Sequence, residues 1–232
     1  MNISRKVDVL TMIRPEGFTN MELDLDWIYS CFEAAGAGWV HSGNSKDPHA
    51  ELASGNCSTV YFDVPRVLRY PNLAGIFGHQ LGKKIRSCGI KVDWVISSAY
   101  AAITFGHEVA KEIGAVFANT EKSDLEKKKM VWRRMSIPEG ATVLQVEELI
   151  TTKSTADEVR RAVEEGNEFK VRFLPQVAAL IHRPPKLPVD YQVISLLEIE
   201  SPVWTPETCP LCQAGSQRVW PKTHWKELTG SK

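Results

Sequence analysis

Two adjacent carboxylates, Glu147 and Glu148, mark the stretch of this sequence that is best suited to chemistry. They follow a mostly apolar run, 143–146, which is typical of a buried strand. A hydroxyl-rich turn comes next, and its residues are Thr151, Thr152, Lys153, Ser154 and Thr155. A helical pattern then begins at 156 and is expected to end at Gly166. Exposed amides and hydroxyls at a helix N-terminus bind anions, and carboxylates beside them suit sugar hydroxyls or a hydrated magnesium ion. The combination predicts a sugar-phosphate site, with the phosphate in the turn and the ribose on the acids.

Each part of this pattern also has a plainer interpretation. An acidic pair can be the solvated end of a strand, and serine and threonine favour helix N-caps without any ligand. The apolar strand before the acids and the hydroxyl turn after them favour the binding site.

The stretch resembles the phosphoribosyl-diphosphate (PRPP) signature of the type I phosphoribosyltransferases, in which a hydrophobic strand runs into two acids and a Thr-Thr-Gly-type turn. Residues 52–63 resemble the Ser-Gly segment of the orotate-specific members, and 93–103 resemble their diphosphate loop. The remaining matches follow in the family's order and are Glu121-Lys122, Ile181-His182-Arg183 and Cys209-Pro210-Leu211-Cys212. The resemblance spans roughly residues 20 to 215 and is closest to the orotate phosphoribosyltransferases.

The resemblance implies an α/β fold, in which helices flank a parallel sheet and a small hood is built from the N-terminal segment and the C-terminal tail. It implies a single domain over 1–232, with the hood roughly at 19–63 and 185–225 and the core roughly at 64–184.

The residues alone predict a compatible core. Apolar runs typical of buried strands are found at 92–96, 116–119, 143–146, 177–181 and 191–198. Helical patterns are found from a capping box at 19–22 to about Ala35, at 71–88 before Gly89, and at 104–113 before Gly114. This alternation predicts a parallel sheet covered on both faces, with the ligand crevice at the C-terminal ends of its strands.

The resemblance also assigns roles to residues. Lys122, Glu147 and Glu148 are the expected catalytic residues, and the hydroxyl turn is the expected site for the ribose and its phosphate. The expected diphosphate loop consists of Ser98, Ala99, Tyr100, Ala101 and Ala102. The expected base-binding residues are Arg183, Ser54 and Gly55. Arginine suits the planar carboxylate of orotate because its fork donates two parallel hydrogen bonds.

The implied reaction transfers the 5-phosphoribosyl group of PRPP to orotate with Mg²⁺ as cofactor, in a homodimer whose two sites lie near the interface. Six positions differ from the family's usual residues, namely Ala53, Ala101, Ala102, Glu148, Lys153 and His182. Two alternatives therefore stay open: a phosphoribosyltransferase for another base, and a non-catalytic nucleotide-binding relative. For Lys153, the sequence allows either a strained positive φ or ordinary dihedral angles.

The composition limits the class of protein. Hydrophobic residues make up 43% of the 232 and charged residues 24%, which are ordinary values for a globular protein. The formal net charge of zero argues against a general nucleic-acid binder. The sequence has no apolar run of membrane-spanning length and no signal-peptide pattern, so we expect no membrane partner and a cytoplasmic location.

Five cysteines, three of them scattered, are poor material for a disulfide framework. Cys209 and Cys212 have the spacing of a zinc knuckle, but no second pair exists and His224 is the nearest histidine in sequence. We therefore predict no metal-ligating residues and a compact turn that packs Leu211 on the core; the alternative is a zinc site that uses His224 with a distant group, or two chains. Lys127, Lys128 and Lys129 predict a solvated hairpin, or by resemblance a catalytic loop that serves a neighbouring subunit.

Overall fold

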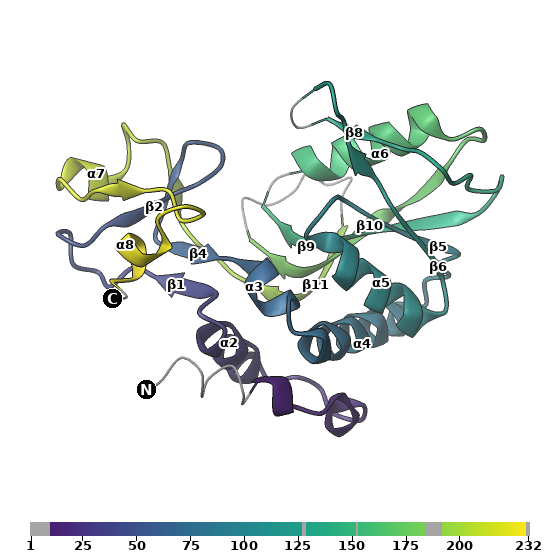
Figure 1. The fold of residues 1–232 in the computed structure, drawn as a ribbon, viewed down its shortest axis with the longest axis horizontal. Helices are drawn as coiled ribbons and strands as arrows, with labels where there is room; N and C mark the ends of the chain where they lie inside the picture. The colour runs from purple at the N-terminus through teal and green to yellow at the C-terminus, as the bar shows by residue number, and fades with distance from the viewer. Residues whose placement is uncertain (1–9, 127–128, 152, 184–191, 231–232) are drawn as a thin grey trace.

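The computed structural model describes residues 10–126, 129–151, 153–183 and 192–230. Its central feature is a five-stranded parallel sheet in the order β11-β10-β9-β5-β6 (Figure 1). The strands are β5 (Trp94–Ser97), β6 (Val116–Asn119), β9 (Thr142–Ile150), β10 (Arg172–His182) and β11 (Gln192–Glu198). The predicted α/β fold with a parallel sheet is confirmed. Because the strands are parallel, the segments that leave β5, β9 and β10 start from the same edge.

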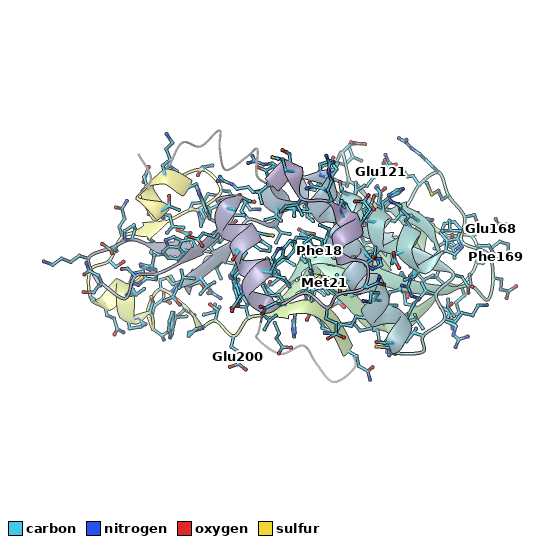
Figure 2. All side chains as sticks on the ribbon, turned by 90° about the horizontal axis from the view of Figure 1, so that it is seen from below. Phe18, Met21, Glu121, Glu168, Phe169 and Glu200 are labelled. Atoms are coloured by element: carbon cyan, nitrogen blue, oxygen red, sulfur yellow. The ribbon has the colours of Figure 1, made fainter. Side chains whose placement is uncertain are left out.

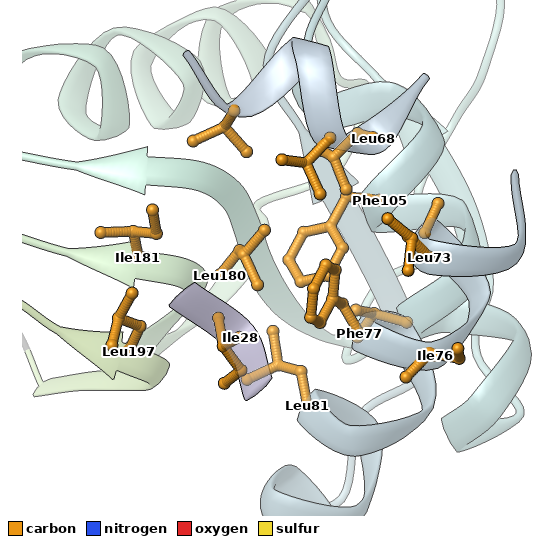
Figure 3. Close-up of a cluster of buried hydrophobic side chains, with 14 of the residues drawn as sticks. Ile28, Leu68, Leu73, Ile76, Phe77, Leu81, Phe105, Leu180, Ile181 and Leu197 are labelled. Atoms are coloured by element: carbon orange, nitrogen blue, oxygen red, sulfur yellow. The ribbon is translucent and has the colours of Figure 1, made fainter. Parts of the chain in front are cut away.

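Helices cover both faces of this sheet, as the sequence predicted. One face packs against α4 (Pro71–Ser87), α5 (Ala102–Ile113) and α2 (Leu25–Ala34), and the other packs against α6 (Ser154–Gly166) (Figure 1). The first face buries the larger apolar cluster, in which Phe77 and Phe105 lie close to Leu180 (Figure 3). All three of these side chains are fully buried.

Two helix contacts depend on glycine. A Cβ atom at Gly78 of α4 would lie 2.5 Å from the Cβ atom of Glu108, so the glycine lets α4 and α5 approach closely. A Cβ atom at Gly166 would lie 2.9 Å from Trp132, which explains glycine at the end of α6. Gly114 has φ of +73° and ends α5 in the left-handed conformation that the sequence predicted.

The N-terminal end of α2 differs from the prediction. Asp24, rather than Thr19, is the N-cap residue, and its carboxylate accepts a hydrogen bond from the amide of Asp26. The predicted capping box at 19–22 is therefore wrong. Thr19 instead donates its hydroxyl to the carbonyl of Glu16, at the end of the 3-10 helix η1 (Pro15–Phe18).

A smaller four-stranded sheet lies beside the core and has the order β12-β3-β2-β13. Its strands are β2 (His49–Glu51), β3 (Cys57–Ser58), β12 (Val203–Trp204) and β13 (Arg218–Val219). Strand β13 pairs with β2 in parallel, which joins the C-terminal tail to the N-terminal segment. The short strands β1 (Gly38–Val40) and β4 (Val60–Phe62) form a separate pair. We call segments 38–62 and 203–229 the hood.

The hood lies at one end of the molecule, and the loop that carries Glu168 and Phe169 lies at the other end (Figures 1 and 2). The hood also contains the short helices α7 (Pro210–Gln213) and α8 (Trp225–Thr229), whereas α3 (Val64–Leu68) leads from β4 into the core. A hairpin of β7 (Glu121–Lys122) and β8 (Met130–Val131) extends from the core. The predicted single domain, with its boundaries, stays a prediction.

One local prediction in the hood is wrong. The loose alternation of residues over 52–63 predicts a strand in which the backbone approaches closely at Gly55. Gly55 instead lies in the turn between β2 and β3 with φ of +81°, and a Cβ atom there would meet nothing within 4 Å. The turn is closed by a hydrogen bond from the Leu52 amide to the Asn56 carbonyl at 2.8 Å. The glycine is explained by its positive φ rather than by close packing.

Candidate active site

The predicted site residues that the structure describes, other than Ser54 and Gly55, lie at or beyond the C-terminal ends of strands of the five-stranded sheet. Ser98 follows β5, Glu147 and Glu148 lie near the end of β9, and Arg183 follows β10. Two hydrogen bonds tie these segments together. The Ser98 hydroxyl donates to Glu147 Oε2 at 2.5 Å, and the Arg183 amide donates to the Ile150 carbonyl at 2.8 Å.

Glu147 is a buried carboxyl group with only 3% of its surface exposed. Gln145 Nε2 donates to its Oε1 atom at 2.8 Å, so both oxygens are hydrogen bonded. Desolvation raises the pKa of Glu147 to about 8, and the neighbouring charge of Glu148 acts in the same direction. The hydrogen bonds from Ser98 and Gln145 oppose this shift without cancelling it. Burial therefore favours the protonated form of Glu147.

Glu148 has different surroundings, because successive side chains of a strand point to opposite faces of the sheet. The register of β9 against β10 is regular here, so Glu147 shares the face of Gln145 and Glu148 shares the face of Val146. Glu148 is partly exposed. Desolvation raises the pKa of Glu148, and the positive charge of Lys222 in the hood opposes that shift. Of the two acids, Glu148 is thus the one whose pKa is lowered by a positive charge of the hood.

The predicted diphosphate loop begins with two buried residues, Ser98 and Ala99, and then exposes Tyr100, whose side chain is 67% accessible. The Nζ atom of Lys122 lies 5.0 Å from the centre of the Tyr100 ring, which is a cation–π distance. Lys122 therefore lies beside this loop, and its catalytic role stays a prediction. Helix α5 begins at Ala102, and no side chain of the described residues caps the amides of its first turn.

The hydroxyl turn leads directly into α6, which begins at Ser154. Lys153 has φ of −78° and ψ of −5°, so it adopts ordinary right-handed dihedral angles and not the strained positive φ. Its Nζ atom lies 3.7 Å from Asp157 Oδ2, one turn further along the helix. Thr151 is partly exposed and Thr155 is exposed. Thr152 lies outside the described residues.

Arg183 is deeply buried, since only 6% of its surface is exposed. Its Nη1 atom donates to the carbonyl of Val60 in β4 at 3.2 Å, which links the core to the hood. Its Nε atom is buried and has no hydrogen-bond partner among the residues that the structure describes. Desolvation lowers the pKa of Arg183. The strand end thus carries a buried cation with few polar partners.

Ser54 and Gly55, the other predicted base-binding residues, lie in the turn between β2 and β3 of the hood. Ser54 is exposed, and its hydroxyl accepts a long hydrogen bond of 3.4 Å from the Asn56 amide. The guanidinium of Arg218 donates to the Gly55 carbonyl at 2.9 Å. This turn is therefore held by the C-terminal tail.

The chain is similar in sequence to known enzymes. No family model matches the chain. The orotate phosphoribosyltransferase of a Nitratiruptor species is 32% identical over 198 residues, which cover 79% of this chain and 95% of the relative. The orotate phosphoribosyltransferase of Campylobacter hominis is 33% identical over 188 residues, which cover 75% and 90%. This chain belongs to the orotate phosphoribosyltransferase family. The predicted resemblance is confirmed, and so is the predicted enzyme class, a glycosyltransferase that transfers a pentosyl group.

The fold agrees with this family. The crystal structure of orotate phosphoribosyltransferase from Aeropyrum pernix superposes with a TM-score of 0.51 at 14% identity, over 73% of this chain and 92% of that one. Among the residues of this chain that the structure describes, no helix is long and apolar enough to span a membrane.

Sequence reasoning missed two residues of the site. Gln145 is fully buried and bonds to Glu147, and its signal was a single polar residue inside an apolar run. Lys222 acts on Glu148, but an exposed lysine in a loop gives no such signal. The sequence also named His224 as the nearest partner for Cys209 and Cys212. The structure brings His49 and Cys57 to them instead.

Proposed function

We propose that this chain transfers the 5-phosphoribosyl group of PRPP to orotate, which gives orotidine 5′-phosphate and diphosphate. The observation that carries the proposal is the buried guanidinium of Arg183, whose Nε atom has no partner among the described residues. A buried charge without partners is costly, and a carboxylate offered to its fork removes that cost. Orotate carries such a carboxylate and uracil does not.

The remaining groups suit the two ends of PRPP. The amides and hydroxyls at the start of α6 would hold the 5′-phosphate, with Thr151, Ser154 and Thr155 as donors. Thr152 belongs to the same proposed set. Backbone amides of 99–102 and the ammonium of Lys122 would hold the diphosphate as it gains negative charge.

The two acids would have different roles. Glu148 is partly exposed and would accept hydrogen bonds from the ribose hydroxyls. Glu147 is buried, which favours its protonated form, and it would position the diphosphate loop through Ser98. Displacement at the anomeric carbon, with oxocarbenium character, would then depend on positioning and electrostatics rather than on a covalent nucleophile.

The donor set also fits magnesium. Mg²⁺ binds one or two carboxylates together with substrate phosphates, and the carboxylate of Glu148 at the edge of the site is such a ligand. A neutral Glu147 is a poor one. When bound, Mg²⁺ would offset the negative charge of the diphosphate and ribose oxygens.

We also propose a homodimer that works in the cytoplasm. The dimer is an implication of the family resemblance, and the five free cysteines suit a reducing compartment. Sedimentation should give a dimer at micromolar concentration, and a monomer alone would contradict this part of the proposal.

The test of the reaction is to incubate the chain with PRPP, Mg²⁺ and single free bases, and to quantify nucleotide and diphosphate. We expect orotidine 5′-phosphate from orotate and little product from uracil. Preferred turnover of another base would replace orotate by that base. PRPP binding without product from any base would support the non-catalytic alternative.

A further inference from the structure

Four side chains with metal-ligating atoms meet inside the hood. The imidazole of His49 and the thiols of Cys57, Cys209 and Cys212 place their ligand atoms within 4.8 Å of one another. They come from β2, from β3 and from the two ends of the turn that forms α7. We infer that these four residues bind one structural zinc ion, which joins the N-terminal segment to the C-terminal tail.

The distances match those of a tetrahedral zinc site. Zinc–sulfur bonds of about 2.3 Å and zinc–nitrogen bonds of about 2.0 Å require ligand atoms about 3.5 to 3.8 Å apart. The Sγ atoms of Cys57 and Cys212 are 3.6 Å apart. The Nε2 atom of His49 lies 3.8 Å from Cys209 Sγ and 3.3 Å from Cys212 Sγ. The remaining pairs of ligand atoms lie within 4.8 Å, so an ion fits after shifts of about 1 Å or less.

The hydrogen bonds around His49 prepare its ring for a metal. The hydroxyl of Ser216 lies 2.6 Å from the Asp47 carbonyl, and it must donate its hydrogen to that acceptor. The same hydroxyl lies 2.8 Å from His49 Nδ1, so it accepts a hydrogen bond from Nδ1–H. The proton then sits on Nδ1, and the lone pair of Nε2 points at the thiols. Zinc-binding histidines are oriented in this way by a partner on the second ring nitrogen.

The cluster is closed rather than open to substrate. His49, Cys57 and Cys209 are fully buried, and only Cys212 is partly exposed. Four protein ligands and no accessible position are features of structural zinc sites, whereas catalytic sites keep one position for water. Three thiolates also favour zinc over magnesium or calcium, which prefer oxygen ligands.

The hood has a physical need for such an ion. Its sheet consists of strands of two or three residues, and its buried apolar cluster contains only Ala50, Val219 and Leu228 among the described residues. A small unit with so little apolar burial usually needs a metal or disulfides in addition. A metal that binds only the folded form contributes its binding free energy to folding. The ion would fasten segments that are about 150 residues apart in the sequence.

The first test uses the unaltered protein without a histidine tag. After purification without chelator, elemental analysis should give one zinc per chain. Replacement with Co²⁺ should give the visible absorption bands of tetrahedral cobalt with thiolate ligands. Thiol titration of the folded protein should find Cys57, Cys209 and Cys212 unreactive until a chelator is added. Absence of zinc, or a disulfide between these cysteines in freshly reduced protein, would overturn the inference.

Variants then locate the ion. Cys209→Ser and Cys212→Ser should each lose most of the zinc, and Cys88→Ser, an exposed cysteine outside the cluster, should keep it. Ser216→Ala removes only the partner of the His49 ring and should weaken zinc affinity about 10- to 100-fold, as measured with a competing chelator. If a cysteine variant fails to fold, the zinc affinity of Ser216→Ala still tests the site. Unchanged zinc affinity in Ser216→Ala, or full zinc content in Cys212→Ser, would rule out this site.

Discussion

The core and the hood are stabilised by different means. The core buries large side chains in two clusters on the faces of its sheet, and Phe32, Phe77 and Phe105 are among the largest that are fully buried. The apolar cluster of the hood contains three buried residues of small or medium size, on which three partly buried aromatic side chains pack, and the hood also gathers a histidine and three cysteines. An apolar core tolerates substitutions that keep its volume and hydrophobic pattern, whereas metal ligands and buried charges each require a specific partner. The candidate site includes a contact between the two parts, the hydrogen bond from Arg183 to the Val60 carbonyl.

The largest effect should follow a cavity in the core. Phe77→Ala should lower the free energy of unfolding by about 3 to 5 kcal/mol, because it removes a fully buried ring and leaves a cavity. Helices α4 and α5 already pack closely at Gly78 and cannot move together to fill it. Urea unfolding measures the loss of stability. The control is Phe169→Ala, where the ring is 41% exposed, and its cost should be much smaller. Equal costs would mean that the core does not dominate stability. Phe77→Ala should leave the zinc content of the folded protein unchanged.

A smaller effect should follow removal of the buried acid. The pKa of Glu147 is raised in the folded protein from about 4.5 to about 8. Between these values the unfolded chain releases a proton that the folded chain keeps, so this group's stabilisation falls as pH rises from about 4.5 to about 8. Glu147→Gln resembles the protonated form, because its amide oxygen can accept from Gln145 and its amide nitrogen would donate to the Ser98 hydroxyl, which reverses the direction of that bond. The variant should therefore lose this part of the pH dependence.

The measurement is urea unfolding of wild type and variant at a series of pH values between about 4.5 and 8.5. The difference in free energy of unfolding between the two proteins should change by roughly 2 to 4 kcal/mol over that window. At the upper end of the window Glu147→Gln should be favoured. Glu168→Gln, an exposed position at the far end of the molecule (Figure 2), should show no such trend. Parallel curves for wild type and Glu147→Gln would mean that Glu147 is ionised at neutral pH.

Removal of the buried guanidinium should weaken orotate binding without lowering the stability of the free protein. Arg183→Ala should weaken orotate binding about 10- to 100-fold, since a charge-assisted hydrogen bond is worth roughly 1.5 to 3 kcal/mol. Arg183→Lys keeps the charge without the fork and should lie between the two. Stability of the free protein should stay the same or rise, because a desolvated charge with few partners is removed.

Calorimetry with orotate and with PRPP makes this comparison, and PRPP affinity should barely change. The matched control is Arg172→Ala, an exposed arginine at the other end of β10. If Arg183→Ala left the ratio of orotate to uracil turnover unchanged, Arg183 would not bind the carboxylate.

The sequence predicts the core better than the hood for a physical reason. The strand, acids and turn around 143–155 are contiguous, so local patterns suffice to predict β9 and the start of α6. The period of two along β9 also implies that Glu147 and Glu148 face opposite sides, although burial of one of them depends on distant residues. The partners of Cys209 and Cys212 are β2 and β3 residues about 150 positions earlier, and no local pattern reports that pairing. The turn at Gly55 was misread because its neighbours resemble a strand.

The smallest effect should come from Lys222, a charge of the hood that acts on Glu148. Lys222 is exposed and lies in the loop between β13 and α8, and its positive charge opposes the raised pKa of Glu148. Lys222→Met should therefore raise that pKa further, by less than about one unit, because an exposed charge is screened by solvent and salt. Glu148 then ionises at a higher pH. Because we expect PRPP to bind the ionised acid, the pH below which PRPP affinity falls should move upward by the same amount as the pKa.

PRPP affinity measured from about pH 5 to 8 at low and high salt tests this coupling. The shift between wild type and Lys222→Met should shrink as salt is added, because screening weakens the interaction in wild type. Lys226→Met, an exposed lysine in α8, is the control and should leave the profile in place. A background of Glu148→Gln should abolish the effect of Lys222→Met on the profile, since the titrating group is gone. A shift that survives in that background would show that Lys222 acts on PRPP directly and that the hood does not tune Glu148.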